Sequence, residues 1–213
     1  MSVTYQAIIF DLDGVIVSTD HYHYLAWAQI AEQEGIEFNE AINHRLRGVS
    51  RIESLEIILE KAVKNYSQAE KLELAERKNE IYRGLLEKLS GKDLLPGVAE
   101  TLPVLREKGC KLAIGSSSKN APLILQRVGL EGVFDAVADG NEIARSKPDP
   151  EVFVLAARML GAEPAACLVV EDAEAGIVAA KRGNMKAAAV GDARKCADAD
   201  YSLASIQEIL ALV

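Results

Sequence analysis

Residues 8–17, with the sequence IIFDLDGVIV, constrain the fold of this chain more than any other stretch. The apolar residues before Asp11 are typical of a strand that is buried on both faces, as in a parallel sheet. That strand ends at Asp11 and Asp13, and Gly14 then lets the backbone turn away. In extended geometry the two carboxylates point to the same side. Two like charges this close are costly without a cation or a proton between them, so the stretch indicates a functional site. An Asp-Gly turn after a core strand is the simpler alternative.

The segment that follows has a different character. From Asp20 to about Leu89, apolar residues recur with helical spacing, and no part of the segment predicts a strand. Four helices are expected, the first ending at Gly35 and the second near residues 39–46. This segment therefore needs a hydrophobic core of its own, made by helices alone.

From residue 95 onward, predicted helices alternate with short apolar segments that are typical of strands. The expected strands span residues 111–115, 134–138, 167–170 and 186–190. Such alternation implies right-handed crossovers and a parallel sheet. The first strand must join that sheet, because the helical segment offers it no partner. The sequence therefore predicts an α/β fold, with a Rossmann-like parallel-sheet catalytic core (residues 1–16 and 90–213) and an inserted four-helix cap domain (residues 17–89).

Composition and charge exclude several classes of function. The 213 residues are 49% hydrophobic and 26% charged, which is ordinary for a globular protein. No apolar run reaches the ~20 residues that span a bilayer, and the start lacks the pattern of a secretory signal, so we expect no membrane partner. The net charge of −8 argues against a nucleic-acid partner but leaves room for a small phosphorylated ligand. Three cysteines without metal-ligand spacing fit a reducing cytoplasm, and we expect a monomer.

Polar residues follow four of the predicted strands, at the point where each strand ends. Asp11 and Asp13 follow the first strand, and residues 116–120, Ser-Ser-Ser-Lys-Asn, follow the second. Lys147 lies in the loop after the third strand, and the pair Glu171-Asp172 follows the fourth. The carboxyl ends of parallel strands face one crevice. These groups meet there if the strands are neighbours, which the sequence alone does not prove.

The carboxylates suggest phosphoryl transfer with a metal ion. Carboxylates from two strands suit Mg²⁺, which prefers hard oxygen ligands, so Asp11 and Asp172 would be ligands with Glu171 beside them. Asp11 would attack phosphorus to give an aspartyl phosphate. Asp13 would act as the general acid and base, protonating the leaving oxygen and later deprotonating the attacking hydroxyl.

The remaining polar groups would hold the phosphoryl group. Hydroxyls and backbone N–H groups of residues 116–120 form an expected anion site, and Lys147 supplies a positive point charge. Each feature has a simpler explanation by itself: a helix cap, a Lys-Pro loop, or charges that favour a helix start. Together the four segments favour phosphoryl transfer.

In this order, the residues resemble the signature motifs of the haloacid dehalogenase superfamily of phosphotransferases. The matching segments are Asp11-Leu12-Asp13-Gly14-Val15, Ser116, Lys147-Pro148 and Glu171-Asp172. The similarity runs over essentially the whole chain. It implies a haloacid-dehalogenase-like core with an inserted cap.

Within that superfamily the chain is similar to the β-phosphoglucomutase family. The segments that carry this similarity are Thr19 and His23 before Trp27, residues 47–51 (Arg-Gly-Val-Ser-Arg), Arg77-Lys78-Asn79 and residues 116–120. The resemblance implies an intramolecular phosphotransferase of the isomerase class. It would interconvert β-D-glucose 1-phosphate and D-glucose 6-phosphate through β-glucose 1,6-bisphosphate, with Mg²⁺ as cofactor and small sugar phosphates as partners.

The resemblance also implies a role for each matching residue. Asp11 corresponds to the nucleophile and Asp13 to the general acid and base, and the expected metal site consists of Asp11, Asp13 (through its backbone carbonyl), Glu171 and Asp172. The expected substrate-binding residues are Thr19, His23, Trp27, Gly48, Val49, Ser50, Arg51, Lys78, Ser116, Ser117, Ser118, Lys119, Asn120 and Lys147. Ser116 and Lys147 match the groups on the transferring phosphoryl, whereas Arg51 and residues 118–120 match those on the distal phosphate. For Trp27, a place in the hydrophobic core of the cap is the favoured alternative.

Two other functions remain open. A sugar-phosphate phosphatase would use the same core chemistry with water in place of the sugar hydroxyl, but it needs no second phosphate site at Arg51. A non-catalytic module that binds a sugar phosphate would have no use for an acid and base at Asp13.

Overall fold

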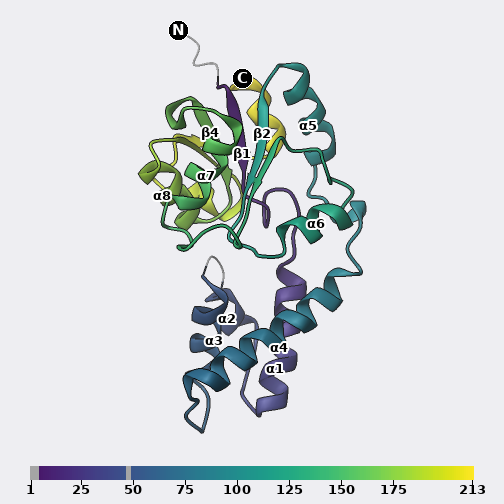
Figure 1. Cartoon of the computed structure of the whole chain (residues 1–213), viewed down its shortest axis with the longest axis vertical. Helices are drawn as coiled ribbons and strands as arrows, with labels where there is room; N and C mark the ends of the chain where they lie inside the picture. Colours follow the sequence, from purple (N-terminus) through teal and green to yellow (C-terminus); the bar gives the residue numbers. More distant parts are fainter. Residues whose placement is uncertain (1–4, 47–48) are drawn as a thin grey trace. The chain divides into compact units, whose positions relative to one another are not determined.

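The computed structural model describes residues 5–46 and 49–213 (Figure 1). In this part of the chain, six strands form one sheet in the order β3-β2-β1-β4-β5-β6, and every neighbouring pair is parallel. The strands are β1 (Ala7–Phe10), β2 (Lys111–Gly115), β3 (Ala136–Ala138), β4 (Cys167–Glu171), β5 (Lys186–Ala189) and β6 (Tyr201–Ser202). β1 lies between β2 and β4 and is buried along its whole length, as its apolar sequence predicts.

Helices cover both faces of this sheet (Figure 1). α7 (Glu151–Leu160) and α8 (Glu174–Arg182) pack on one face, where Phe153 and Ile177 join a core with Ile9, Ala113 and Val169. α5 (Val98–Glu107) and α6 (Ala121–Arg127) lie on the opposite side, and η4 (Ile206–Ala211) packs against α5. Three further 3₁₀ turns are η1 (Gly91–Asp93), η2 (Pro164–Ala166) and η3 (Gly191–Lys195).

The segment between β1 and β2 forms the helical cap. Its helices are α1 (Asp20–Glu34), α2 (Glu40–His44), α3 (Arg51–Leu59) and α4 (Gln68–Leu86). Their apolar faces meet in a separate core that includes Trp27, Ile30, Leu55, Ile58 and Leu74. As predicted, the described residues of the cap contain helices and no strand.

Internal contacts divide the chain into two compact units. One unit combines the residues up to Ser18 with Ser90–Val213, and the other spans Thr19–Leu89. Among the described residues, no helix is both long enough and apolar enough to cross a bilayer.

Two strands differ from the sequence-based prediction by two residues or more, whereas β4 ends one residue later and β5 one residue earlier than predicted. β3 begins at Ala136 rather than at residue 134, because the Asp135 carboxylate accepts the Leu112 backbone N–H at 2.8 Å and pairs with Arg106. β6 was not predicted, because two residues are too few to show a strand pattern. Its Tyr201 hydroxyl lies 2.8 Å from the hydroxyl of Tyr5, close to the start of β1.

Candidate active site

Three neighbouring strands of the core end at one edge of the sheet, where the predicted site residues that follow these strands lie. Phe10 of β1 pairs with Ile114 of β2 and with Val170 of β4, so these three strands end at the same level. The Asp11 backbone N–H donates to the Val170 carbonyl at 2.9 Å, which fixes the start of the turn after β1. β2, β1 and β4 are therefore neighbours in the sheet, which is the condition that the sequence alone did not prove.

Two buried carboxylates, a third that is partly buried, and one ammonium group meet at this edge. Oxygen atoms of Asp11, Glu171 and Asp172 all lie within 4.8 Å of one another. Lys147 Nζ donates to the Asp11 carboxylate and, at 2.8 Å, to Glu171 Oε2. The same ammonium lies 4.6 Å from the centroid of the Phe153 ring. One positive charge thus faces three acidic groups, and hard oxygen donors with excess negative charge suit a divalent cation.

Burial and repulsion within this cluster shift its pKa values. Burial, aided by the charge of Asp11, raises the pKa of Glu171, and the same two causes raise the pKa of Asp172 to about 7. Burial alone would lower the pKa of Lys147, but the Asp11 and Glu171 carboxylates outweigh it and raise that pKa. A bound cation would relieve the same repulsion that protons relieve here, so the charge of the cluster, like its donor set, fits a metal site.

The turn after Asp11 depends on Gly14. Its φ is +81°, its N–H donates to the Val17 carbonyl at 2.8 Å, and a Cβ there would lie 2.0 Å from a carboxylate oxygen of Asp172. Glycine is therefore required both for the left-handed backbone and for space. The preceding residue, Asp13, forms an isolated β-bridge with Val17. Its charge helps to raise the pKa of Asp172, but its side chain does not belong to the group of three carboxylates.

The loop after β2, residues 116–120, is shaped by its own hydroxyl groups. The Ser116 backbone N–H donates to the Ala138 carbonyl at 3.0 Å, and its Oγ accepts the Ser118 N–H at 3.1 Å. Ser118 Oγ in turn accepts the Asn120 N–H at 3.2 Å. Each hydroxyl that accepts in this way retains its own proton for another acceptor. In the described part of the chain, Ser117 Oγ is buried without a hydrogen-bond partner.

In the cap, a buried ammonium lies among aromatic rings. Lys78 Nζ lies 2.7 Å from His23 Nδ1, and 4.5 Å and 5.0 Å from the ring centroids of Tyr82 and Trp27. An ammonium can only donate, so Nδ1 accepts and the imidazole is neutral. Burial, with the charges of Lys78 and Arg51, lowers the pKa of His23 well below its ordinary value. The Tyr82 hydroxyl donates to Thr19 Oγ1 at 2.8 Å.

The other predicted cap residues lie at the start of α3. Arg51 donates to Asn79 Oδ1 at 2.9 Å and contacts Glu76 at 3.5 Å, while the Ser50 side chain accepts the Glu53 N–H and caps the helix. Val49 is exposed. The expected residue Gly48 lies outside the described residues. Trp27 belongs to the hydrophobic core of the cap, which was its favoured alternative.

Two residues that shape the acidic cluster were not identified from the sequence. Phe153 supports Lys147, and Gly176 of α8 lies against Glu171, because a Cβ at Gly176 would be 2.1 Å from the Glu171 carboxyl carbon. Neither residue carries a polar group, so neither stands out in a search for chemistry.

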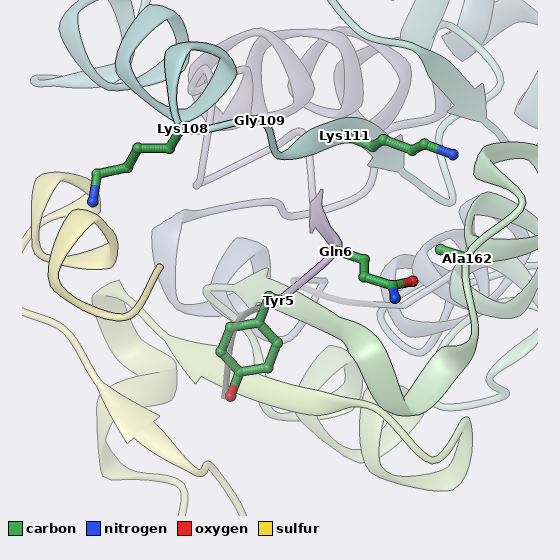
Figure 2. Close-up of a pocket in the computed structure, with 6 residues that line it drawn as sticks. All are labelled: Tyr5, Gln6, Lys108, Gly109, Lys111 and Ala162. Atoms are coloured by element: carbon green, nitrogen blue, oxygen red, sulfur yellow. The ribbon is translucent and has the colours of Figure 1, made fainter. Parts of the chain in front are cut away.

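A pocket at the opposite end of the strands does not share these features (Figure 2). Its lining residues are Tyr5, Gln6, Lys108, Gly109, Lys111 and Ala162. Both of its lysines already donate to backbone carbonyls, Lys111 to Leu160 at 2.7 Å and Lys108 to Val213 at 2.8 Å. It lies at the amino ends of β1 and β2, away from the carboxylates.

Known proteins share both the sequence and the fold. A β-phosphoglucomutase from Bacillus subtilis is 48% identical over 197 residues, which cover 92% of this chain and 87% of that protein. A phosphorylated carbohydrates phosphatase from Thermotoga maritima is 32% identical over 184 residues, which cover 85% of this chain and 82% of that protein. The crystal structure of a β-phosphoglucomutase from Clostridium difficile has a TM-score of 0.88 and 38% identity, covering 96% of this chain and 93% of that one.

The family model of haloacid dehalogenase-like hydrolases matches residues 5–184, which include every strand from β1 to β4 and the acidic cluster. By this match, this chain belongs to the haloacid dehalogenase-like hydrolase family.

Proposed function

We propose that this protein is a Mg²⁺-dependent β-phosphoglucomutase that interconverts β-D-glucose 1-phosphate and D-glucose 6-phosphate through β-glucose 1,6-bisphosphate. The observation that carries the proposal is the 48% identity to a β-phosphoglucomutase over 92% of the chain. The cluster of Asp11, Lys147, Glu171 and Asp172 supplies the matching chemistry. In this proposal the two compact units are the catalytic core and the cap domain.

Asp11 is the proposed nucleophile. Its carboxylate attacks the phosphorus of the bisphosphate, the bond from phosphorus to the sugar oxygen breaks, and an aspartyl phosphate forms on Asp11. Asp13 gives a proton to the departing sugar oxygen and takes it back when a sugar hydroxyl attacks the phosphoenzyme. Lys147, which donates to Asp11, holds that carboxylate in place and adds a positive charge beside the phosphoryl group.

The proposed metal site consists of Asp11, Glu171, Asp172 and the backbone carbonyl of Asp13. When bound, Mg²⁺ supplies positive charge that offsets the repulsion between the nucleophile and the phosphoryl oxygens. The raised pKa values of Glu171 and Asp172 support this assignment, because such carboxyl groups gain most from a cation.

Two groups of residues would bind the sugar phosphates. Ser116 and Lys147 hold the transferring phosphoryl group, and Arg51 with residues 118–120 holds the distal phosphate, since a guanidinium binds phosphate oxygens as a bidentate fork. Of the other cap residues in the proposed set, Gly48 and Val49 would face the sugar with their backbone, and His23 and Lys78 would lie near the active site. Thr19 and Ser50 complete the set. A distal site that accepts either phosphate lets the bisphosphate react in both orientations.

A paired assay tests the proposal. Purified protein with Mg²⁺ and a trace of β-glucose 1,6-bisphosphate is given α- or β-glucose 1-phosphate, and D-glucose 6-phosphate is followed by a coupled dehydrogenase. We expect product from the β anomer. Inorganic phosphate is measured in the same samples, and its rapid release without D-glucose 6-phosphate would replace the mutase with a sugar-phosphate phosphatase, the activity named for the Thermotoga maritima relative.

A further inference from the structure

The turn that follows β3, residues 139–142, touches the phosphate-binding loop although none of its residues belongs to the proposed site. We propose that Gly140 and Asn141 are positioning residues that set the backbone conformation of residues 116–120. The inference rests on the proposed function, because it assumes that this loop binds phosphate. It adds a structural element that none of the signature motifs contains.

Gly140 lets the two backbones approach each other. A Cβ at this position would lie 2.3 Å from the Ser117 carbonyl oxygen and 3.0 Å from the Lys119 nitrogen. Both are backbone atoms, so no side-chain rotation can relieve the clash. The φ angle of Gly140 lies outside the left-handed region that favours glycine, so space alone excludes a side chain here.

Hydrogen bonds join the turn and the end of β3 to successive residues of the loop. Ala138 accepts the Ser116 N–H at 3.0 Å, and the Gly140 N–H donates to the Ser118 carbonyl at 3.2 Å. Asn141 Nδ2 then donates to the Lys119 carbonyl at 3.0 Å. These hydrogen bonds are spread over the loop from its first residue to its fourth. The end of β3 and the turn after it can therefore fix the backbone conformation of the loop.

The turn is itself held by its own side chains. The Asp139 carboxylate accepts the Asn141 N–H at 2.7 Å, and Glu142 Oε2 accepts the Asp139 N–H at 3.3 Å. Asp139 is buried, whereas Asn141 is exposed. A turn fixed in this way transmits its shape to the loop, while Asn141 can be changed without disturbing the core.

The consequence is geometric. In the loop, the Ser116 and Ser118 hydroxyls already accept backbone N–H groups, so the direction of each free hydroxyl proton follows the backbone. A backbone shift would therefore misdirect several donors to phosphate at once. The carboxylates of the acidic cluster come from the ends of β1 and β4, and none of them belongs to this turn.

The first test replaces Asn141 by Asp, which keeps the shape and removes the donor to Lys119. Isothermal titration of the Mg²⁺-loaded protein with inorganic phosphate should show an affinity loss of about fivefold, the worth of one typical hydrogen bond. Amide hydrogen exchange in residues 116–120 should become faster without any ligand, and the affinity for Mn²⁺ should not change. Asn65→Asp, at an exposed position of the cap, controls for the change in the net charge of the protein.

The second test replaces Gly140 by Ala. Phosphate affinity should fall by at least about tenfold, and KM for β-glucose 1-phosphate should rise more than kcat falls, while Mn²⁺ affinity is retained. Gly91→Ala is the matched control, because a Cβ there would find only the Val128 carbonyl, at an ordinary 3.5 Å. If Gly140→Ala does not fold, Asn141→Asp decides.

The outcomes separate the inference from the function. Unchanged phosphate affinity and unchanged amide exchange in the variants would overturn the inference alone. A parallel loss of Mn²⁺ affinity in folded protein would also overturn it, since the effect would then not be confined to the loop. A parent protein that binds no phosphate would contradict the proposed function and the inference with it.

Discussion

The two compact units each bury a cluster of charged groups, and the clusters have opposite signs. In the α/β core, three carboxylates surround one ammonium, that of Lys147. In the cap, the ammonium of Lys78 lies beside a neutral imidazole and two aromatic rings, and the guanidinium of Arg51 acts on the same imidazole.

Burial opposes charge in both clusters, but with opposite consequences. In the core it raises the pKa of Glu171 and Asp172, and in the cap it lowers the pKa of His23 and Arg51. Each cluster would therefore be relieved by a ligand of the other sign, a cation in the core and an anion in the cap. A metal ion and a phosphorylated sugar are the ligands of the proposed function.

The largest effect is expected on turnover, from removing the proposed proton donor of the core, Asp13. Asp13→Asn should reduce turnover by about 10²–10⁴-fold, because the leaving sugar oxygen loses its proton donor. Mn²⁺ binding, measured by electron paramagnetic resonance, should survive because the backbone carbonyl and the other carboxylates remain. A variant as active as the parent would remove Asp13 from the assigned role.

Removing the single ammonium of the core tests how that cluster is balanced. Lys147→Met should destabilise the metal-free protein by about 3–5 kcal/mol, since it leaves buried carboxylates without their partner. Urea unfolding measures the loss, and added Mg²⁺ should restore part of it. The control Lys186→Met removes an exposed ion pair with Asp200 and should cost at most about 1 kcal/mol. Equal losses would mean that the core cluster is not balanced by Lys147.

Replacing a helical glycine by alanine should have different effects in the two units: it should weaken metal binding in the core and stabilise the cap. Gly176→Ala in α8 displaces the Glu171 carboxylate and should weaken Mn²⁺ binding by about 10–100-fold, as lost support of a metal ligand does. Gly84→Ala in α4 meets nothing within 4 Å and should stabilise the protein by up to about 1 kcal/mol without affecting the metal. Unchanged metal affinity in Gly176→Ala would show that Glu171 is not held for a metal.

The pH dependence follows from the raised pKa values of the core. The folded pKa of Asp172, about 7, lies above its unfolded value near 3.9, so the metal-free fold binds the proton more tightly than the unfolded chain does. Its contribution to stability is therefore lost as pH rises from about 4 to 7. Metal affinity, measured by calorimetry, should fall about tenfold per pH unit below pH 7 for each proton displaced. Affinity that is independent of pH would contradict a proton at this site.

The smallest effect is expected in the cap. Lys78→Met removes one of the two positive charges that lower the pKa of His23, so that pKa should rise while burial still keeps it below its ordinary value. Nuclear magnetic resonance of the imidazole nitrogens measures the shift. Lys71→Met, which breaks an ion pair with Glu56 elsewhere on the cap, should leave it unchanged. A His23 pKa that stays where it is in Lys78→Met would contradict the electrostatic coupling.

The sequence predicted what depends on a local pattern and missed what depends on contact across the chain. The strand before Asp11 and the inserted helical cap follow from periodicity, and the meeting of Lys147 with Asp11 follows once the strands are neighbours. The pairing of His23 with Lys78 joins residues 55 positions apart, and nothing in either local sequence indicates it. The Asp-Gly pair at 139–140 indicates a turn, but nothing in the local sequence shows which segment its backbone contacts.

Phosphoryl transfer to Asp11 can be observed directly. The parent protein, mixed with Mg²⁺ and β-glucose 1,6-bisphosphate and quenched with acid within milliseconds, would be digested and mapped by mass spectrometry. We predict one added phosphoryl group on the peptide that contains Asp11, and its loss in Asp11→Asn. A phosphoryl group on another residue, or none while D-glucose 6-phosphate still forms, would contradict the proposed mechanism.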